Sequence, residues 1–274
     1  MKKIFLILSA GLISFSGFSQ IPAGYYDSAI GLTGEDLREE LHQIIKGHTS
    51  ISYSSIKSTH HANTDRKPDG TVWDMYSDVP GGTSPYIYNF VDADKCGNYS
   101  EEGDCFNREH SVPGSWYNDA SPMYTDLFHV YATDGYVNGR RDSHPFGNVA
   151  SATWTSDNGC KLGSSATAGY SGTVFEPIDE YKGDFARTYF YIATRYKDVV
   201  SGWSSAMFNS DNLSNWAIDL MLDWDENDPV SQKEIDRNNA VHDIQNNRNP
   251  YIDNPNYIDV VWGDGLPNDS NSTV

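Results

Sequence analysis

The sequence predicts a single α+β domain over residues 20–263 of a 274-residue chain. Apolar residues recur at helical spacing in some segments, whereas other short segments are rich in aromatic and β-branched residues and are separated by Gly and Pro turns. Hydrophobic residues make up 38% of the chain and aromatic residues 13%, which is enough to fill a core and excludes a wholly disordered protein. No internal repeat or long linker divides the chain, so we expect one domain.

In the first part of the chain, Thr33 with the acidic residues that follow it is typical of a capping box and predicts a helix over 35–46. Two strands are expected at 71–76 and 86–90, because both segments are rich in aromatic residues and the turn-forming residues 80–82 lie between them.

In the second part of the chain, aromatic residues at helical spacing predict a helix over 179–198, and a further helix is expected over 214–224. Asp228 then has the features of an N-cap with Pro229 at the first helical position. The helix that this pair would open carries Ile235, Val241 and Ile244.

The two ends of the chain are expected to lie outside the domain. Residues 1–19 have two lysines, an apolar stretch and small residues before Gln20, which is typical of a cleaved signal peptide. We therefore expect a secreted or periplasmic protein in a compartment that permits disulfides. Residues 264–274 are polar and are predicted to be disordered.

The charge balance is strongly acidic, with 38 Asp and Glu against 19 Lys and Arg and a formal net charge of −19. This excludes a polycation that coats nucleic acid or an anionic membrane by bulk charge. It does not exclude an enzyme that acts on nucleic acid, which needs only local positive groups and a metal at the phosphate. After residue 20, no apolar run approaches the roughly 18 residues that cross a bilayer, so no membrane partner is expected.

Three cysteines lie in the expected domain: Cys96, Cys105 and Cys160. Cys96 and Cys105 bracket a loop containing Gly and Ser that can close on itself, so they are the candidate disulfide, and a pairing that involves Cys160 stays open. A zinc site is not expected, because no CxxC or paired His spacing accompanies the cysteines.

The residues suited to catalysis concentrate between 105 and 148. Asn-Arg-Glu-His at 107–110 is followed by Asp126 with His129, and then by Val-Asn-Gly-Arg-Arg at 137–141. Hydrolysis of a phosphodiester needs a base for water, a hard cation for the phosphate oxygens and donors that hold the phosphate. Histidine can be that base near neutral pH, and Glu and Asn supply oxygen ligands suited to Mg²⁺ or Ca²⁺. An isolated Glu-His pair would be an ordinary surface dipeptide.

Taken together, these motifs resemble the bacterial endonuclease I family, which comprises periplasmic or secreted nucleases of the ββα-metal (His-Me finger) class. The likeness covers about 25–262 and nearly the whole expected domain. It includes further segments that stand in the family's order, at 25–26, 31–34, 96–99, 174–187, 228–230, 237–238 and 247–253.

The resemblance implies a ββα-metal finger embedded in the mixed domain, with a hairpin that starts near 107 and a helix that carries Asn138. It implies that His110 is the general base, with its other ring nitrogen held by a backbone carbonyl. Glu109 and Asn138 would be the protein ligands of one Mg²⁺, which Ca²⁺ or Mn²⁺ can replace. The expected enzyme is a monomeric, non-specific endonuclease that leaves 5′-phosphates on DNA, with RNA as a further substrate.

Other site residues follow from a difference between this chain and part of the family. Members with a longer segment between the His and the Asn take a phosphate-binding Arg from that insertion, which is absent here. Arg140 or Arg141 is the expected substitute, with Arg108 behind them. His129 and Asp126 are expected to support the site through hydrogen bonds rather than to touch metal or substrate. A more distant arginine, Arg187, either reaches the site or pairs with the neighbouring Asp184.

Two alternatives accompany this hypothesis. The first is a calcium loop, because acidic or amide residues occupy positions 1, 3, 5 and 12 of an EF-hand pattern. These are Asp223, Asp225, Asn227 and Glu234. Position 6 of the pattern is an Asp where Gly is needed and a Pro follows, so a helix end with a new N-cap explains the residues better. The second is a non-catalytic acidic surface module that holds Ca²⁺. The sequence leaves open the preference between DNA and RNA and between single and double strands.

Overall fold

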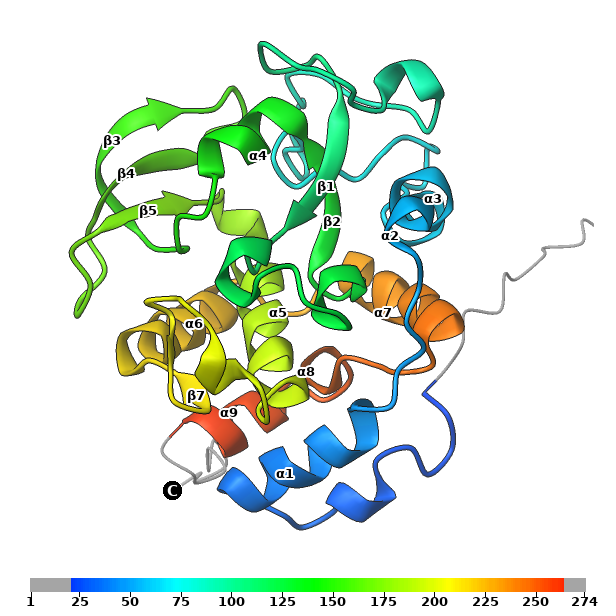
Figure 1. Cartoon of the computed structure of the whole chain (residues 1–274), viewed down its shortest axis with the longest axis vertical. Coiled ribbons are helices and arrows are strands. Elements are labelled where there is room, and N and C mark those ends of the chain that lie inside the picture. The colour runs from blue at the N-terminus through cyan, green and yellow to red at the C-terminus, as the bar shows by residue number, and fades with distance from the viewer. Residues whose placement is uncertain (1–20, 264–274) are drawn as a thin grey trace, which may run out of the picture.

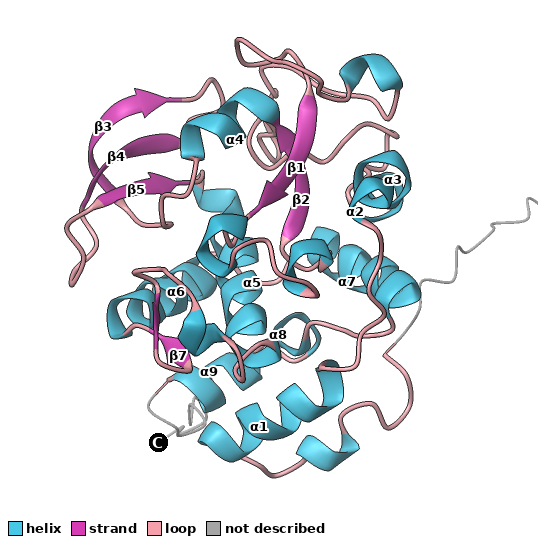
Figure 2. Ribbon diagram, viewed as in Figure 1, coloured by secondary structure: helices cyan, strands magenta, loops and turns pink. Residues whose placement is uncertain are grey.

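The computed structural model describes residues 21–263, so the expected signal peptide and polar tail lie outside the described residues. The fold has a helical part gathered around α5 (Lys182–Arg195) and a part with small antiparallel sheets, as Figure 1 and Figure 2 show. Every residue of α5 except Lys182 is buried, because other helices pack around it. The longer neighbours in this part are α1 (Gly34–Ile45), α6 (Asn215–Asn227), α7 (Gln232–Gln245) and α9 (Asn256–Trp262), with the short α8 (Pro250–Asp253) between the last two.

A strand pair followed directly by a helix lies in the upper part of Figure 1. Strand β1 (Phe106–His110) pairs antiparallel with β2 (Val130–Asp134), and α4 (Gly135–Arg141) follows β2 without a loop. The Asp134 carboxylate caps α4 by accepting a hydrogen bond from the backbone nitrogen of Val137 at 2.7 Å. A strand that starts near 107 and a later helix that carries Asn138 are therefore confirmed.

A second, three-stranded antiparallel sheet lies on the other side of α4 (Figure 1). Its strands are β3 (Val149–Thr155), β4 (Lys161–Ser165) and β5 (Thr173–Glu176), in that order. Strand β3 is an edge strand with mostly exposed side chains, and its register against β4 shifts at two places. A further small hairpin, β6 (Phe208–Asn209) with β7 (Asn212–Leu213), packs near the helical part.

On the right of Figure 1, two short helices flank β1. These are α2 (Tyr53–Ser55) and α3 (His61–Thr64), joined by a π-helical turn at Ile56–His60. The turn contacts β1, and α3 packs against α7. These elements connect the helical part to the strand pair.

The helix predictions hold in three places and fail at one boundary. Helices α1, α5 and α6 lie in the expected segments. Helix α7, however, does not open at Asp228 and Pro229, because Ser231 and Glu234 form a complete capping box three residues later. The Asp228 side chain instead accepts a hydrogen bond from the backbone of Gly183 at 2.9 Å. Among the side chains expected on this helix, Val241 is buried, but Ile235 is 40% exposed.

The two strands expected at 71–76 and 86–90 do not form. The Asp74 carboxylate accepts a hydrogen bond from the backbone nitrogen of Tyr76 at 2.8 Å, which folds the segment into a turn. Two aromatic residues of these segments are nevertheless buried, and their hydroxyls bind acidic residues of the strand pair. Tyr76 donates to Glu109 at 2.8 Å, and Tyr88 donates to Asp134 at 2.5 Å.

The expected disulfide between Cys96 and Cys105 is confirmed, and Cys160 is a free, buried thiol. The loop that this disulfide closes carries Tyr99, which packs against Gly135 and Gly139 of α4. A Cβ at Gly139 would lie 2.8 Å from the Tyr99 hydroxyl, so only glycine admits this approach. In the described part of the chain, no helix is long and apolar enough to cross a membrane.

Candidate active site

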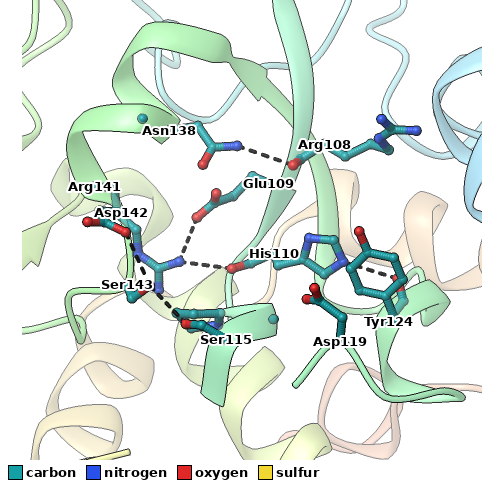
Figure 3. A pocket seen from close by; sticks show the side chains of 13 residues that line it. Arg108, Glu109, His110, Ser115, Asp119, Tyr124, Asn138, Arg141, Asp142 and Ser143 are labelled. Carbon is teal, nitrogen blue, oxygen red and sulfur yellow. Dashed lines mark hydrogen bonds and ion pairs between the residues drawn. The ribbon is translucent and has the colours of Figure 1, made fainter. Parts of the chain in front are cut away.

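A pocket of about 300 Å³ opens where the end of β1 faces α4 (Figure 3). It is lined by Arg108, Glu109 and His110 of β1 and by Asn138, Gly139 and Arg141 of α4. The remaining walls come from residues of the connection between β1 and β2 and from two residues after α4. The pocket thus brings together Glu109 and His110, which are adjacent on β1, and Asn138, which lies on α4 after the second strand of the pair.

Glu109 is nearly completely buried, at 1% exposure, and only one of its two oxygens is engaged. Its Oε1 atom accepts hydrogen bonds from the Tyr76 hydroxyl at 2.8 Å and from Nη1 of Arg141 at 2.9 Å. Among the described residues, none donates a hydrogen bond to Oε2. Burial raises the pKa of Glu109, and the charge of Arg141 with the bond from Tyr76 opposes that rise.

Asn138 is oriented by two acceptors on β1. Its Nδ2 atom donates to Oδ1 of Asn107 at 2.7 Å and to the carbonyl oxygen of Arg108 at 3.2 Å. Because the amide nitrogen must face these acceptors, Oδ1 is turned to the side where Glu109 lies (Figure 3). The position of Asn138 follows from the fold, since α4 begins directly after β2 and runs beside β1.

These two oxygens fit a hard divalent cation. Oε2 of Glu109 and Oδ1 of Asn138 face one pocket, come from two rigid elements and lack hydrogen-bond donors among the residues described. Mg²⁺ typically binds one or two carboxylate or amide oxygens of a protein and keeps several waters. No group of three or more His, Cys, Asp or Glu side chains able to hold a metal occurs within 21–263.

His110 lies at the end of β1 with its ring fixed on two sides. Its Nε2 atom is 3.0 Å from the carbonyl oxygen of Tyr124, and its ring stacks on the Tyr124 ring at a centroid distance of 4.8 Å. Because a carbonyl only accepts, Nε2 carries the proton and Nδ1 is left as the acceptor. Burial, with a smaller effect of nearby His129, lowers the pKa of His110 to about 3. The imidazole is therefore neutral, and its Nδ1 atom is left as a hydrogen-bond acceptor.

Arg141, one of the two expected phosphate contacts, lines the pocket, but its guanidinium is engaged by buried acceptors. Its guanidinium is 1% exposed and points into the protein. Besides its bond to Glu109, it donates to the carbonyl oxygens of His110 at 2.8 Å and Ser111 at 2.6 Å. It also lies over the ring of Phe146 at 4.7 Å. Arg141 lies on the buried face of α4, where these acceptors are within hydrogen-bond distance. Its guanidinium therefore holds the Glu109 carboxylate in position.

The two other candidate arginines lie at the surface on opposite sides of the strand pair. Arg108 lines the pocket, and its guanidinium lies 3.8 Å from the centre of the Tyr53 ring. Arg140 is exposed, does not line the pocket and lies over the ring of Trp154 at 5.4 Å. Arg108 is thus the one of the three candidate arginines that lines the pocket without being fully buried, and its Nη1 donates to the carbonyl oxygen of Tyr53 at 3.2 Å.

Of the two expected supporting residues, only His129 touches the site. Its ring meets the His110 ring edge-on at a centroid distance of 5.6 Å, and its Nε2 is 2.7 Å from the carbonyl oxygen of Met123. Asp126 is buried deeper and accepts hydrogen bonds from the hydroxyls of Tyr191 at 2.9 Å and Tyr196 at 2.8 Å. Asp126 therefore anchors the segment between β1 and β2 to α5 and the residue that follows it, and it makes no hydrogen bond to the pocket residues.

Arg187 is part of a buried ion-pair network away from the pocket. It binds Glu234 through Nε at 2.5 Å and Asp225 through Nη1 at 2.5 Å, rather than Asp184, which pairs with Lys233. Two of the four residues of the EF-hand pattern are thus engaged by one guanidinium. The pattern does not form a calcium loop, in agreement with the helix end preferred from the sequence.

Sequence reasoning did not identify Tyr76 and Tyr124 as parts of the site. Tyr76 reaches Glu109 from 33 positions earlier in the chain, and Tyr124 reaches His110 through its backbone as well as its ring. No local motif marks either residue, because their roles arise from where the chain returns to the end of β1.

The chain is similar to known nucleases over most of its length. The family model for endonuclease I matches residues 33–256. The chain is 31% identical over 250 residues to an extracellular ribonuclease of Bacillus subtilis, covering 87% of this chain and 78% of that protein. It is 33% identical over 247 residues to an extracellular ribonuclease of Bacillus amyloliquefaciens, with the same coverage of 87% and 78%. It is also 25% identical over 128 residues to an endonuclease-1 of Buchnera aphidicola, covering 47% of this chain and 44% of that protein.

Proposed function

This chain is an endonuclease that belongs to the endonuclease I family, and we propose that it hydrolyses phosphodiester bonds of DNA and RNA with Mg²⁺ at the pocket between β1 and α4. The observation that carries the proposal is the set of three acceptor atoms that face this pocket: Nδ1 of His110, Oε2 of Glu109 and Oδ1 of Asn138. Under this proposal, β1, β2 and α4 are the ββα-metal finger of the family.

The division of roles follows from the hydrogen bonds of each side chain. Glu109 and Asn138 would hold Mg²⁺, which when bound supplies positive charge that neutralises the non-bridging and leaving oxygens of the phosphate. His110 takes a proton from the attacking water at Nδ1, while the Tyr124 carbonyl holds the proton on Nε2. Arg141 and Tyr76 fix the Glu109 carboxylate through Oε1. The products are a 5′-phosphate and a 3′-hydroxyl.

We assign the phosphate-binding role to Arg108 in place of Arg141. The Arg108 side chain is half-buried at the pocket wall, and stacking on Tyr53 limits its motion. A guanidinium fixed in this way can donate two parallel hydrogen bonds to a phosphate at little cost in side-chain entropy.

The proposed substrates and location draw on the relatives. The two relatives that cover most of this chain are named extracellular ribonucleases, which supports RNA as a substrate beside DNA and supports export of this chain. We further propose that the enzyme acts as a monomer.

The test is to incubate the purified protein with plasmid DNA and with RNA, in Mg²⁺ and in EDTA, and to identify the new ends. We expect cleavage of both in Mg²⁺, none in EDTA, and 5′-phosphates on every product. RNA fragments with 2′,3′-cyclic phosphates would mean that the ribose hydroxyl, and not water, is the nucleophile. Absence of cleavage by the folded, Mg²⁺-loaded protein would instead favour the acidic calcium-binding module.

A further inference from the structure

Arg108 and Arg140 differ from most cations of this acidic protein. Most Lys and Arg side chains within 21–263 form ion pairs with carboxylates. Neither Arg108 nor Arg140 has a carboxylate partner among the described residues, and each lies over an aromatic ring instead. Tyr53 belongs to α2, whereas Arg140 belongs to α4 and Trp154 to β3, and Figure 1 shows α2 on the opposite side of the strand pair from α4 and β3. Arginine next to an exposed aromatic ring is a common way to bind a nucleotide.

The Arg140 pair belongs to a small surface, which we call the α4–β3 ledge, formed by Tyr136, Arg140 and Trp154. Trp154 is half-buried on an edge strand whose neighbouring side chains are exposed, and its ring meets the Tyr136 ring at a centroid distance of 6.4 Å. Arg140 immediately follows Gly139, which lines the pocket, so the ledge adjoins the proposed site along α4.

A change of register in β3 accompanies the position of Trp154. Ala152 pairs with Gly163 and Trp154 pairs with Leu162, so Thr153 is an extra residue in the strand. Such bulges re-aim the side chains that follow them, and here the side chain that follows lies against α4. A Cβ at Gly163 would lie 2.1 Å from the carbonyl oxygen of Ser151, so glycine is needed where the bulged strand crosses β4.

From these contacts we propose that the α4–β3 ledge binds an unpaired nucleotide next to the scissile phosphate, and that the enzyme therefore prefers single-stranded nucleic acid to duplex. The base would stack on the Trp154 ring, with the Tyr136 ring edge-on beside it, and Arg140 would bind the adjoining phosphate. A base inside a duplex has both faces covered by its neighbours and cannot stack on the ledge. This inference rests on the proposed function, since it assigns the substrate's form at the same site.

The first test compares cleavage of one oligonucleotide as a single strand and as a blunt duplex. We expect the wild type to cut the single strand faster. Trp154→Ala should lower kcat/KM for the single strand by about 5- to 150-fold, the usual value of one base stacked on an aromatic ring, and leave the duplex rate within about twofold. Trp154→Phe, which keeps an aromatic ring, should restore most of the loss. Arg140→Ala should reduce the slope of log affinity against log salt by about 0.7 for the single strand.

The matched control is Trp216→Ala on α6. Trp216 is also half-buried and is stacked on an aromatic ring, that of Tyr170, at 4.6 Å, but it does not line the pocket. The Trp216→Ala substitution should leave the ratio of single-strand to duplex cleavage unchanged. If Trp216→Ala changes that ratio as much as Trp154→Ala does, or if the wild type prefers duplex, the ledge is not a binding site.

A second test measures binding without cleavage. A single strand carrying 2-aminopurine is titrated with the His110→Ala protein, and stacking on the ledge should quench the probe's fluorescence. The quenching should be lost in His110→Ala/Trp154→Ala and retained in His110→Ala/Trp216→Ala. Equal quenching in all three proteins would show that the α4–β3 ledge does not bind the nucleotide. If the His110→Ala protein quenches the probe but the wild type cleaves no nucleic acid, only the proposed function is wrong.

Discussion

The carbonyl oxygen of Tyr124 lies 3.0 Å from Nε2 of His110, while the Tyr124 ring is stacked on the imidazole at 4.8 Å. One residue therefore sets both the tautomer of His110 and the plane of its ring. The carbonyl decides which nitrogen is free to accept a proton, and the stacked ring keeps that nitrogen at the pocket. This contact supports His110 as the base more directly than the sequence motif does, because the motif gives no tautomer.

Replacing His110 should separate catalysis from stability. His110→Ala should lower kcat by about 10²–10⁴, the usual contribution of general-base catalysis, with little change in Tm or Mg²⁺ affinity. Steady-state kinetics, thermal unfolding and a Mg²⁺ titration measure the three quantities. His242→Ala on α7 is the control, because this histidine lies outside the pocket. A folded His110→Ala protein with nearly wild-type turnover would reject the assignment of the base.

Replacing the two proposed metal ligands should change the dependence on Mg²⁺. Glu109→Gln and Asn138→Ala should both raise the Mg²⁺ concentration that gives half-maximal activity. The effect of Glu109→Gln should be larger, because a carboxylate offers a full charge to the cation and an amide only a dipole. Activity measured across a Mg²⁺ series checks this order. Equal Mg²⁺ dependence in the wild type and both variants would mean that neither side chain binds the metal.

Replacing the neighbouring residues Arg140 and Arg141 should change the free energy of unfolding by very different amounts. Arg141→Ala leaves the Glu109 carboxylate buried without its charged partner, so it should lower the free energy of unfolding by about 3–5 kcal/mol. Arg140→Ala removes an exposed side chain and should change the same quantity by less than about 0.5 kcal/mol. Urea unfolding of both variants provides the comparison. Similar losses in the two would contradict the burial of Arg141.

His61 should make the protein less stable in acid. It is fully buried, and burial lowers its pKa from 6.5 to about 4, with Asp65 opposing that change and Arg237 adding to it. The unfolded chain therefore binds a proton below pH 6.5 that the folded protein does not bind until about pH 4. The stability from this group is complete above pH 6.5 and is lost as the pH falls towards about 4.

The measurement is urea unfolding of the wild type and His61→Phe at pH 7 and pH 5. Because one pKa unit corresponds to about 1.4 kcal/mol, the stability difference between the two proteins should shift by about 2 kcal/mol against the wild type at the lower pH. A difference that stays constant between the two pH values would show that His61 titrates normally in the folded protein.

Several features were predictable because they depend on short stretches of chain. The acidic residues after Thr33 begin α1 where expected, and the short loop between Cys96 and Cys105 closes with the disulfide that its length allowed. The resemblance to the family implied a strand that starts near 107 and a later helix that carries Asn138, and β1 and α4 lie at those places.

Other features were not predictable, and Arg140 with Arg141 shows why. The two residues are adjacent and identical in type, but successive positions on a helix point about 100° apart. Which of them becomes buried depends on the carbonyl groups of His110 and Ser111 that α4 covers after folding. The roles of Arg140 and Arg141 therefore depend on the folded structure and not on the sequence of the pair.

The sequence by itself determined the residue types of the candidate site and their order, because the spacing of Glu109, His110 and Asn138 is a property of the chain alone. Only the tertiary structure decided which atoms of these residues remain available. Oε1 of Glu109 is occupied because Tyr76 and Arg141 arrive from distant segments, and Nδ1 of His110 is free because Tyr124 holds the other nitrogen. Hydrogen bonds of this kind depend on the path of the whole chain, since burial forces each polar group to find a partner wherever the fold brings one within reach.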